Sequence, residues 1–488
     1  MTPCGTMNQT TRILPPAPAP HALAEHEAQV ARDLETLNLP PRNWMPALAR
    51  NGVGVLDVVV VGAGMNGIAA AGALIFKGIR NIAVLDASAP GQEGPWVTTA
   101  RMDTLRSPKT LPGPCFGIPS LTFRAWHEAN CGAEAWEGLY KIPNAMWQDY
   151  LGWLMRVLRL PVTHDTRVTR ISPAEGLLRL TLDDGRAMLA RRVVLATGRA
   201  GAGGLHVPAH VDPALFPDRA ALAPTAIDFA ALRGRSIALI GGGASAWDNA
   251  ATALEQGAAE AHMYVRRAIL PQINKGRGSA GPAFHIGWHA LSIAERWNLI
   301  AYMQDAQAPP PHESVNRALR QPNFHIHLAT PVHAARRGAD GVVLDLPGRQ
   351  VTHDFLIIGT GFVVDLDHVP ELAEFAPHAA RWQDRYTPPE ALRRPDMARF
   401  PFLGGGFELE PRDASAPPEL TRIHLMNYGA HASHGGIASD IPGVAVAGER
   451  LAVAIVRHFF QEEIGAMRRE LEAFDEPELE GTPFFVAR

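Results

Sequence analysis

The chain has 488 residues, of which 47% are hydrophobic and 19% charged, and a formal net charge of −4, which is typical of a globular protein with two or three domains. No long basic run accompanies this small charge, so neither nucleic acid nor an anionic membrane is expected as the main partner. The three cysteines, Cys4, Cys115 and Cys131, form no CxxC pair and no metal-binding spacing, which favours a reduced, cytosolic protein.

The first fifty residues predict an N-terminal arm and a helix. Residues 1–20 end in a proline-rich stretch that is typical of a flexible or extended arm. Residues 21–37 carry apolar side chains at helical spacing. No basic region followed by an apolar core stands at the N-terminus, so no signal peptide is expected.

The strongest motif is VVVVGAGMNG, at residues 58–67. Its four valines predict a strand that is buried on both faces, and residues 68–78, rich in Ala and Leu, predict a helix. Between them, Gly62 allows a tight turn, Gly64 lets the backbone approach a pyrophosphate, and Gly67 lets helix and strand pack closely. The helix N-terminus then offers unpaired N–H groups to the phosphates.

The next strand, over residues 82–85, supports a dinucleotide-binding unit. It ends in Asp86, about 20 positions after the last glycine, where a carboxylate can hold a ribose hydroxyl. The nearly uncharged residues 58–76 leave a membrane span as the alternative. The clustered glycines and Asn66 argue against a continuous span.

A stretch rich in proline and glycine follows at residues 90–119. It is too long for a turn and too apolar for a disordered linker, so we expect an ordered loop that lies along the cofactor. The loop carries Trp96, Arg106 and Lys109. Lys109 could orient a substrate or a nicotinamide there, and an ordinary solvated lysine is the alternative.

A helix and a set of short strands are predicted to complete the first unit. The helix, over residues 142–160, has an aromatic face for which core packing is the favoured interpretation. The strands lie between residues 166 and 198 and end in Ala-Thr-Gly. Such small residues let the chain pass close to a cofactor or cross between domains, although a plain turn is also compatible.

A second dinucleotide unit is predicted further along the chain. A strand over residues 236–240 precedes the turn GGGASA at 241–246, whose last alanine the fingerprint permits, and a helix. The following strand, over 261–265, ends in Arg266 and Arg267. Arginine accommodates a 2′-phosphate, whereas a carboxylate favours a free 2′-hydroxyl, so the first unit is predicted to bind FAD and the second NADPH. A purely structural role for the two arginines is the alternative.

Residues 271–335 are rich in Pro, His and Trp. Each histidine alone is more typical of a structural or surface position than of a catalytic one, but as a group they could line a substrate pocket. His325 and His327 alternate as on one face of a strand. The sequence offers no third ligand beside them, so no metal site is predicted.

Two strands with similar glycine-rich ends frame the second unit. One ends at Gly198, and the other is DFLIIGTGF at residues 354–362. They predict an inserted domain, entered near residue 205 and left near residue 355. After it, residues 443–449 predict a buried strand and residues 451–460 a helix whose N-terminus could face the flavin, as could His434.

This combination resembles the class B flavoprotein monooxygenases, which include flavin-containing, N-hydroxylating and Baeyer–Villiger monooxygenases. The resemblance covers roughly residues 50–460 and rests on the two glycine fingerprints, on LATG at 195–198 and on DFLIIGTGF. That last segment is similar to the Asp-x-x-x-Leu-Ala-Thr-Gly-Tyr of the N-hydroxylating members, from which it departs at Ile358, Gly359 and Phe362.

The resemblance implies an α/β fold with two Rossmann-like dinucleotide-binding domains, the NADP domain being inserted into the FAD domain. The expected boundaries are 1–50 for the N-terminal arm and helix, 51–205 for the first part of the FAD-binding domain, 206–350 for the NADP-binding domain with a substrate-lining insert, and 351–488 for the return of the FAD-binding domain and the C-terminal region.

The resemblance also implies a reaction. NADPH would reduce FAD, the reduced flavin would react with O2 to give a C4a-(hydro)peroxyflavin, and one oxygen atom would pass to a small molecule. The Baeyer–Villiger fingerprint is missing at its expected spacing, and the missing CxxC disfavours a disulfide reductase. N- or heteroatom hydroxylation is favoured, with ring hydroxylation of a purine-like heterocycle as a further option. The alternatives are a flavin-dependent NAD(P)H oxidoreductase or oxidase without oxygen transfer, and a non-catalytic dinucleotide-binding sensor.

The residues expected at the two cofactors lie in or beside the glycine turns, or carry a charge suited to ribose or phosphate. They are Gly62, Gly64, Met65, Asn66, Gly67, Asp86, Trp96, Arg106, Val168, Thr197, Gly198, Gly241, Gly243, Ala244, Ser245, Arg266, Arg267, Gly359, Thr360, Gly361 and Gly448. Lys109 and His434 are the catalytic candidates. The expected partners are a small-molecule substrate and O2, and assembly into a homo-oligomer is compatible with the sequence.

Overall fold

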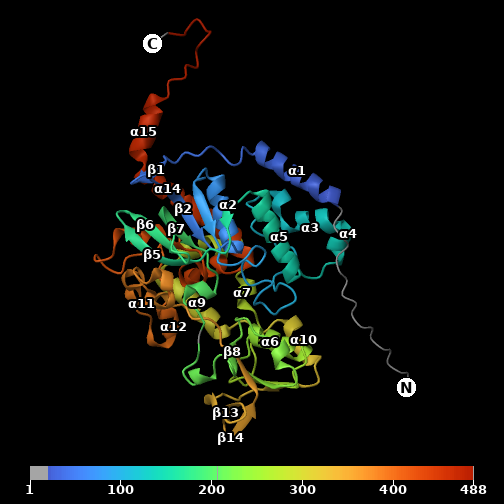
Figure 1. Cartoon of the computed structure of the whole chain (residues 1–488). Coiled ribbons are helices and arrows are strands. Elements are labelled where there is room, and N and C mark those ends of the chain that lie inside the picture. Colours follow the sequence, from blue (N-terminus) through green and yellow to red (C-terminus); the bar gives the residue numbers. More distant parts are fainter. Residues whose placement is uncertain (1–19, 206, 487–488) are drawn as a thin grey trace.

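The computed structural model describes residues 20–205 and 207–486 (Figure 1). The arm predicted for residues 1–20 lies outside the described residues except for its last position, where helix α1 (Pro20–Thr36) begins. This helix confirms the one predicted over residues 21–37. It packs against helix α3 (Phe123–Cys131).

The first sheet has eight strands in the order β4-β3-β2-β7-β6-β5, with β1 paired to β2 and β16 to β7. The strands are β1 (Leu48–Arg50), β2 (Val53–Val61), β3 (Ile82–Leu85), β4 (Val162–Thr163), β5 (Val168–Ala174), β6 (Leu177–Leu182), β7 (Ala187–Leu195) and β16 (Ile423–Leu425). Strand β2 runs parallel to β3 and to β7, and its Val58, Val59 and Val60 are fully buried. This is the pattern of a parallel strand covered on both faces, and it confirms the predicted strands of the first unit.

Helix α2 (Met65–Phe76) follows β2 and packs against helix α14 (Val444–Glu462). The two helices come so close that a Cβ at Gly448 would lie 2.6 Å from the carbonyl oxygen of Ala69. The strand predicted over residues 443–449 is wrong, because residues 444–449 are the first turns of α14. The alternation of Val and Ala suggested a strand, but the buried positions recur at the helical period, at Val444, Ala447, Leu451, Ile455 and Phe459.

The second sheet has five parallel strands in the order β11-β10-β9-β15-β8. They are β8 (Ala220–Leu222), β9 (Ser236–Ile240), β10 (Glu260–Tyr264), β11 (Phe324–His327) and β15 (Phe355–Ile358). Helix α6 (Ala244–Glu255) covers one face, together with α10 (His312–Leu319). A small antiparallel sheet covers the other face and consists of β12 (Ala334–Arg337), β13 (Val342–Leu346) and β14 (Arg349–His353).

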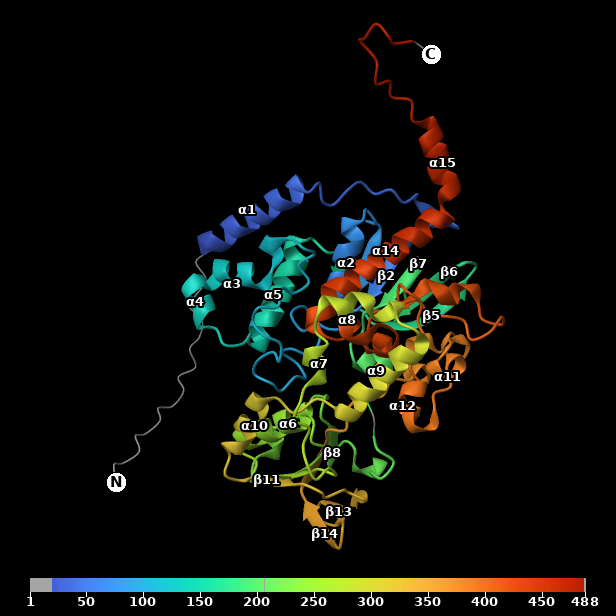
Figure 2. The ribbon, with the colours of Figure 1, turned by 180° about the vertical axis from the view of Figure 1, so that it is seen from behind.

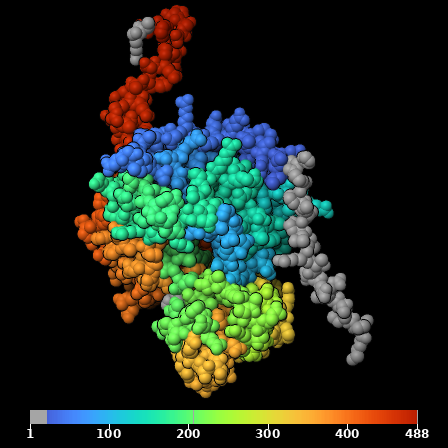
Figure 3. All heavy atoms as spheres, viewed as in Figure 1, coloured from blue at the N-terminus to red at the C-terminus, as the bar shows by residue number. Residues whose placement is uncertain are grey.

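The two faces of the second sheet follow the alternation of its strands. Ile237 and Leu239 of β9 join the core under α6, whereas Ala238 and Ile240 join the core under β13. The five-stranded sheet, with its covering elements, forms a lobe below the first sheet (Figure 3). In chain order, all five of its strands lie between β7 and β16 of the first sheet.

The remaining helices fall into two groups. The first group, α4 (Ala133–Gly138) and α5 (Asn144–Val157), joins α3 beside the first sheet. The aromatic residues predicted on α5, Trp147, Tyr150 and Trp153, are buried there, which confirms core packing. None of the described helices is long and apolar enough to cross a membrane. The membrane span considered for residues 58–76 is wrong, because these residues are divided between β2 and α2.

The second group lies beside the C-terminal elements (Figure 2). Its helices are α7 (Lys275–Gly278), α8 (Pro282–Gly287), α9 (Ile293–Ala306), α11 (Trp382–Arg385), α12 (Pro395–Ala398) and α13 (His431–His434), whereas α15 (Ile464–Ala473) follows α14 and projects away from them. Trp288 and Trp297 share a core with Trp382, Phe402 and Ala432. The segment around α8 and α9 therefore packs on the C-terminal part of the chain and not on the second sheet.

Candidate cofactor site

The first glycine turn joins the end of β2 to the start of α2. Gly62 has φ +102°, and a Cβ there would lie 2.7 Å from the carbonyl oxygen of Ala196. A Cβ at Gly67 would lie 1.8 Å from the carbonyl oxygen of Gly62. The fold itself therefore requires glycine at both positions.

Gly64 differs from these two glycines. A Cβ at Gly64 would meet no atom closer than 3.9 Å, and its φ of −66° and ψ of −172° suit any residue. The protein alone does not explain a glycine at this position. The open space at Gly64 leaves room for a ligand to approach the backbone.

The N-terminus of α2 opens onto the same space. Among the described residues, no side chain caps this helix at Gly64. The first N–H groups of a helix have no intrahelical acceptor, and they attract anions together with the helix dipole. The turn can therefore hold a phosphate group.

Asp86 ends β3 beside this turn and is buried. Its Oδ2 accepts a hydrogen bond from the backbone N–H of Ala63 (2.7 Å), and its Oδ1 accepts one from that of Ser88 (2.8 Å). These bonds fix the carboxylate next to the glycine turn. Each oxygen keeps a further lone pair for an outside donor.

The loop over residues 90–119 is ordered, as predicted, and passes beside the glycine turn at Gly94. Gly94 provides the atoms closest to a Cβ at Gly64, and Trp96 packs edge-on against Trp147 at 6.2 Å between ring centroids. The buried Glu93 lies 2.5 Å from Nε2 of His164 and accepts a hydrogen bond from Gln148 Nε2 (2.7 Å). Glu93 could not be predicted from the sequence, because its partners come from distant parts of the chain.

The C-terminal segment closes the other side of the turn. Asn66 Nδ2 donates to the carbonyl oxygens of Met426 (2.9 Å) and Ala438 (2.7 Å). Asn427 Nδ2 donates to Oγ1 of Thr197 (3.1 Å), in the predicted Ala-Thr-Gly segment. Asn427 could not be predicted either, since nothing in its local sequence indicates this contact.

Arg106 connects the loop with the second unit. Its Nη2 lies 3.2 Å from Oδ2 of Asp248 on α6. Burial raises the pKa of Asp248, and hydrogen bonds from Ser314 and Arg106 act in the opposite direction. The ion pair joins two elements that are predicted to bind different cofactors.

The second glycine turn repeats the geometry of the first. Gly241 has φ +121°, and a Cβ there would lie 2.4 Å from the carbonyl oxygen of Gly359. A Cβ at Gly359 would in turn lie 2.9 Å from that of Ala246, so packing explains both glycines. A Cβ at Gly243 would meet no atom within 4 Å. Gly243, at the start of α6, thus corresponds to Gly64.

Arg266 and Arg267 follow β10 after a single intervening residue, Val265. Arg266 is exposed and Arg267 half-buried. Neither side chain forms a hydrogen bond or an ion pair within the described part of the chain. Beside a hydrogen bond from Arg394, the charge of Arg267 contributes to lowering the pKa of Asp305. The guanidinium groups of Arg266 and Arg267 can both meet an anionic ligand.

The two catalytic candidates have other partners. Lys109 Nζ donates to the carbonyl oxygens of Trp136 (2.7 Å) and Glu137 (3.3 Å), at the end of α4. His434 is fully buried, with Nε2 at 2.9 Å from the carbonyl oxygen of Gly404 and Nδ1 at 3.0 Å from Arg450. Burial holds its pKa well below the usual value, so the ring is neutral. These contacts hold both side chains in place.

Other predicted positions also have structural explanations. Val168 is buried at the start of β5, and the packing of α14 on α2 accounts for Gly448. A pocket of about 940 Å³ lies beside α14 at the end of α2, lined by residues such as Lys77, Phe116 and Glu449. None of the predicted site residues lines this pocket.

Two family models match the sequence. A model for FAD-NAD(P)-binding proteins matches residues 59–200, and one for L-lysine 6-monooxygenase/L-ornithine 5-monooxygenase matches residues 139–314. A curated FAD-dependent urate hydroxylase from Xanthomonas campestris is 40% identical over 462 residues, which cover 94% of this chain and 98% of that protein.

Solved structures show the same fold at low sequence identity. An ornithine hydroxylase from Pseudomonas aeruginosa aligns with a TM-score of 0.65 and 19% identity, covering 83% of this chain and 99% of that one. An L-lysine 6-monooxygenase from Pseudomonas syringae aligns with a TM-score of 0.64 and 19% identity, covering 82% and 99%.

Proposed function

Because this chain belongs to the class B flavoprotein monooxygenases and is an FAD-dependent monooxygenase, we propose that it hydroxylates urate or a closely related purine at the expense of NADPH. One observation carries this proposal: the 40% identity to a urate hydroxylase extends over nearly the whole of both chains. The ornithine and lysine hydroxylases share only 19% of their residues with this chain. The comparison thus favours a heterocycle as substrate, whereas the sequence alone favoured N- or heteroatom hydroxylation.

The first glycine turn is proposed as the binding site of the FAD pyrophosphate. The N–H groups of Met65, Asn66 and Gly67 would face the phosphates, and Gly64 leaves the space that this requires. Asp86 would accept a hydrogen bond from the ribose. The remaining positions proposed along the flavin are Gly62, Trp96, Arg106, Val168, Thr197, Gly198, Thr360, Gly361 and Gly448.

The second glycine turn is proposed to bind NADPH. Gly243, Ala244 and Ser245 would face the pyrophosphate, supported by Gly241 and Gly359. Arg266 and Arg267 would pair with the 2′-phosphate, which NADH lacks. In this proposal residues 206–350 are an NADP-binding domain inserted into an FAD-binding domain of residues 51–205 and 351–488.

Bound FAD would supply the redox chemistry that activates O2. The chain would contribute binding, orientation and exclusion of water, and the structure offers elements suited to each task. The turn at Gly64 would bind the pyrophosphate of FAD, and Asp86 would orient its ribose. The hydrogen bonds of Asn66 hold the C-terminal segment over the turn. The reaction consumes one O2, one NADPH and one proton for each substrate hydroxylated, and releases NADP+ and one water.

The test is a stoichiometric assay with the purified, FAD-loaded protein. NADPH oxidation, O2 uptake, peroxide formation and urate absorbance are followed together, with ornithine and lysine as comparison substrates. We expect urate to accelerate NADPH oxidation, with equal consumption of urate, NADPH and O2 and little peroxide. Stoichiometric peroxide without loss of urate would show an oxidase, and binding of NADPH without flavin reduction would show a sensor.

A further inference from the structure

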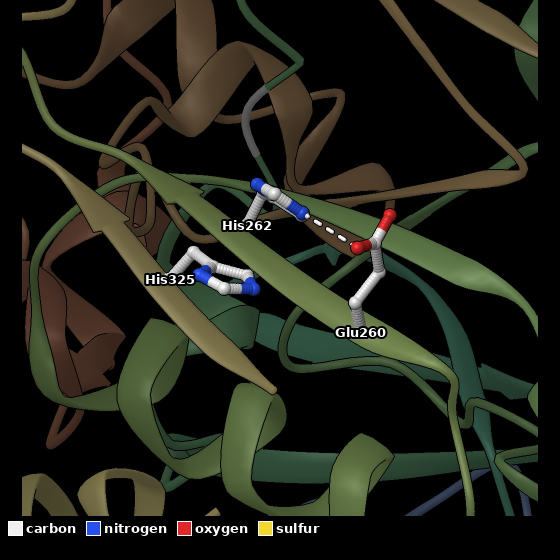
Figure 4. Close-up of side chains that lie close together, drawn as sticks. All are labelled: Glu260, His262 and His325. Carbon is white, nitrogen blue, oxygen red and sulfur yellow. Dashed lines mark ion pairs between the residues drawn. The ribbon is translucent and has the colours of Figure 1, made fainter. Parts of the chain in front are cut away.

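The second sheet carries a cluster of histidines on strands β10 and β11, outside both glycine turns. Glu260, His262 and Tyr264 alternate along one face of β10, and His325 and His327 lie on the same face of β11, opposite His262 and Tyr264. Figure 4 shows Glu260, His262 and His325 close together on these strands. The cluster was not foreseen, because β10 and β11 lie about 60 residues apart in the sequence and meet only through parallel pairing.

Three of these side chains offer donor atoms to a common point. Nε2 of His262 lies 3.2 Å from Oε2 of Glu260, and the donor atoms of Glu260, His262 and His325 all lie within 4.8 Å of one another. In a tetrahedral zinc site, bonds of about 2.0–2.2 Å place neighbouring donors roughly 3.4 Å apart. His325 is exposed, so a rotation of its side chain can close the remaining distance.

Nε2 of His262 is buried and faces Oε2 of Glu260 in an ion pair, drawn as the dashed line in Figure 4. This ion pair does not have the geometry of a hydrogen bond. A buried ring nitrogen and a carboxylate oxygen that face each other in this way can hold a metal ion between them.

Neighbouring residues hold the other atoms of the same two ligands. Nδ1 of His262 lies 3.0 Å from Nε2 of His327, and Ser236 Oγ donates to Oε1 of Glu260 (2.7 Å). Ser236 Oγ also lies 2.8 Å from Nδ1 of His353. Such partners orient ligands in metal sites and leave the opposite atom, here Nε2 or Oε2, free to bind.

We propose that Glu260, His262 and His325 form a binding site for a divalent transition metal ion such as Zn²⁺, with water as the remaining ligand. Two imidazoles and one carboxylate suit Zn²⁺, Cu²⁺ or Ni²⁺, whereas Mg²⁺ prefers oxygen ligands.

The site lies away from the proposed NADPH turn. Ser236 begins strand β9, while the glycine turn follows the opposite end of that strand. A bound ion would join the edge strand β11 to β10. It would therefore stabilise the second sheet and leave the proposed reaction unchanged.

The test uses untagged, FAD-loaded protein that has been treated with EDTA and dialysed. Bound Zn²⁺ is measured by competition with a chromophoric chelator and by elemental analysis, with Mg²⁺ as the comparison ion. The variants are His325→Ala, Glu260→Gln and His327→Gln. The matched control is His333→Ala, which removes an exposed histidine of the same region outside the cluster.

We expect one tight Zn²⁺ per chain in the wild type and in His333→Ala, and loss of that site in His325→Ala and Glu260→Gln. The His327→Gln variant should bind Zn²⁺ about 10- to 100-fold more weakly, because its ring orients a ligand. Zn²⁺ should also raise the melting temperature of the wild type but not of His325→Ala. Equal Zn²⁺ binding by the wild type and His325→Ala, or no tight binding by the wild type, would overturn the proposal.

Discussion

Replacement of Gly64 by valine should weaken FAD binding strongly while leaving the fold intact. In the structure a Cβ at this position has open space, with the closest atoms 3.9 Å away on Gly94. The backbone there is extended, with φ −66°, which valine adopts readily. The substitution changes only the residue before the helix, where valine is less favourable than glycine, so we expect the apoprotein to lose no more than about 1 kcal/mol of stability.

The loss of FAD binding should be much larger. The valine side chain would occupy the space through which the pyrophosphate reaches the N–H groups of α2. A hydrogen bond to a charged group contributes about 1.5–3 kcal/mol. Since 1.4 kcal/mol corresponds to a factor of ten, each lost bond should weaken FAD binding by roughly 10- to 100-fold.

Flavin content after purification and FAD titration by fluorescence measure this effect, and circular dichroism monitors the fold. The matched control is Gly54→Val on strand β2, which leads into the turn, where a Cβ meets no atom within 4 Å. That variant should retain FAD. In contrast, Gly67→Val should fail to fold, since its Cβ would lie 1.8 Å from a carbonyl oxygen. A Gly64→Val protein with stoichiometric flavin would refute the proposed site.

Three further predictions follow from other parts of the structure. The double substitution Arg266→Ala and Arg267→Ala should raise the KM for NADPH while leaving that for NADH nearly constant, and an unchanged preference in steady-state kinetics would exclude a phosphate contact. Burial, together with the charge of Arg192, lowers the pKa of His424 to about 3. Because the unfolded state therefore binds more protons between pH 6.5 and 3, this residue should reduce the free energy of unfolding by roughly 5 kcal/mol as the pH falls through that range. Urea unfolding of wild type and His424→Gln across this pH range measures the difference, and parallel curves would contradict it. Trp147→Ala should cost about 3–5 kcal/mol, since the ring is fully buried among aromatic residues, and a thermal shift near zero would argue against that packing.

Local patterns in the sequence were sufficient to predict both glycine turns and the strands and helices around them. The spacing of Gly62 and Gly67 reflects a contact between residues close in the chain. Hydrophobic runs such as residues 58–61 predict the central strands, because this pattern also depends only on neighbouring residues. The predictions at this level needed no tertiary information.

Features that depend on distant contacts could not be predicted. Residues 444–449 were expected in a strand, because an alternation of Val and Ala fits either period until the packing partner is known. The carbonyl partners of Lys109 belong to a helix end that the sequence did not reveal. The third donor beside His325 depends on the register between β10 and β11.

The hydrogen bonds of Asn66 have a consequence for biosynthesis. Its two carbonyl acceptors lie 360 and 372 residues further along the chain. A ribosome that adds about 5–20 residues per second needs roughly 20–75 s to synthesise that length. The first glycine turn of the nascent chain therefore lacks these two hydrogen bonds until translation is nearly finished, and flavin binding becomes a late event. Chains that terminate before Ala438 would leave the ribosome without the C-terminal segment that covers the turn.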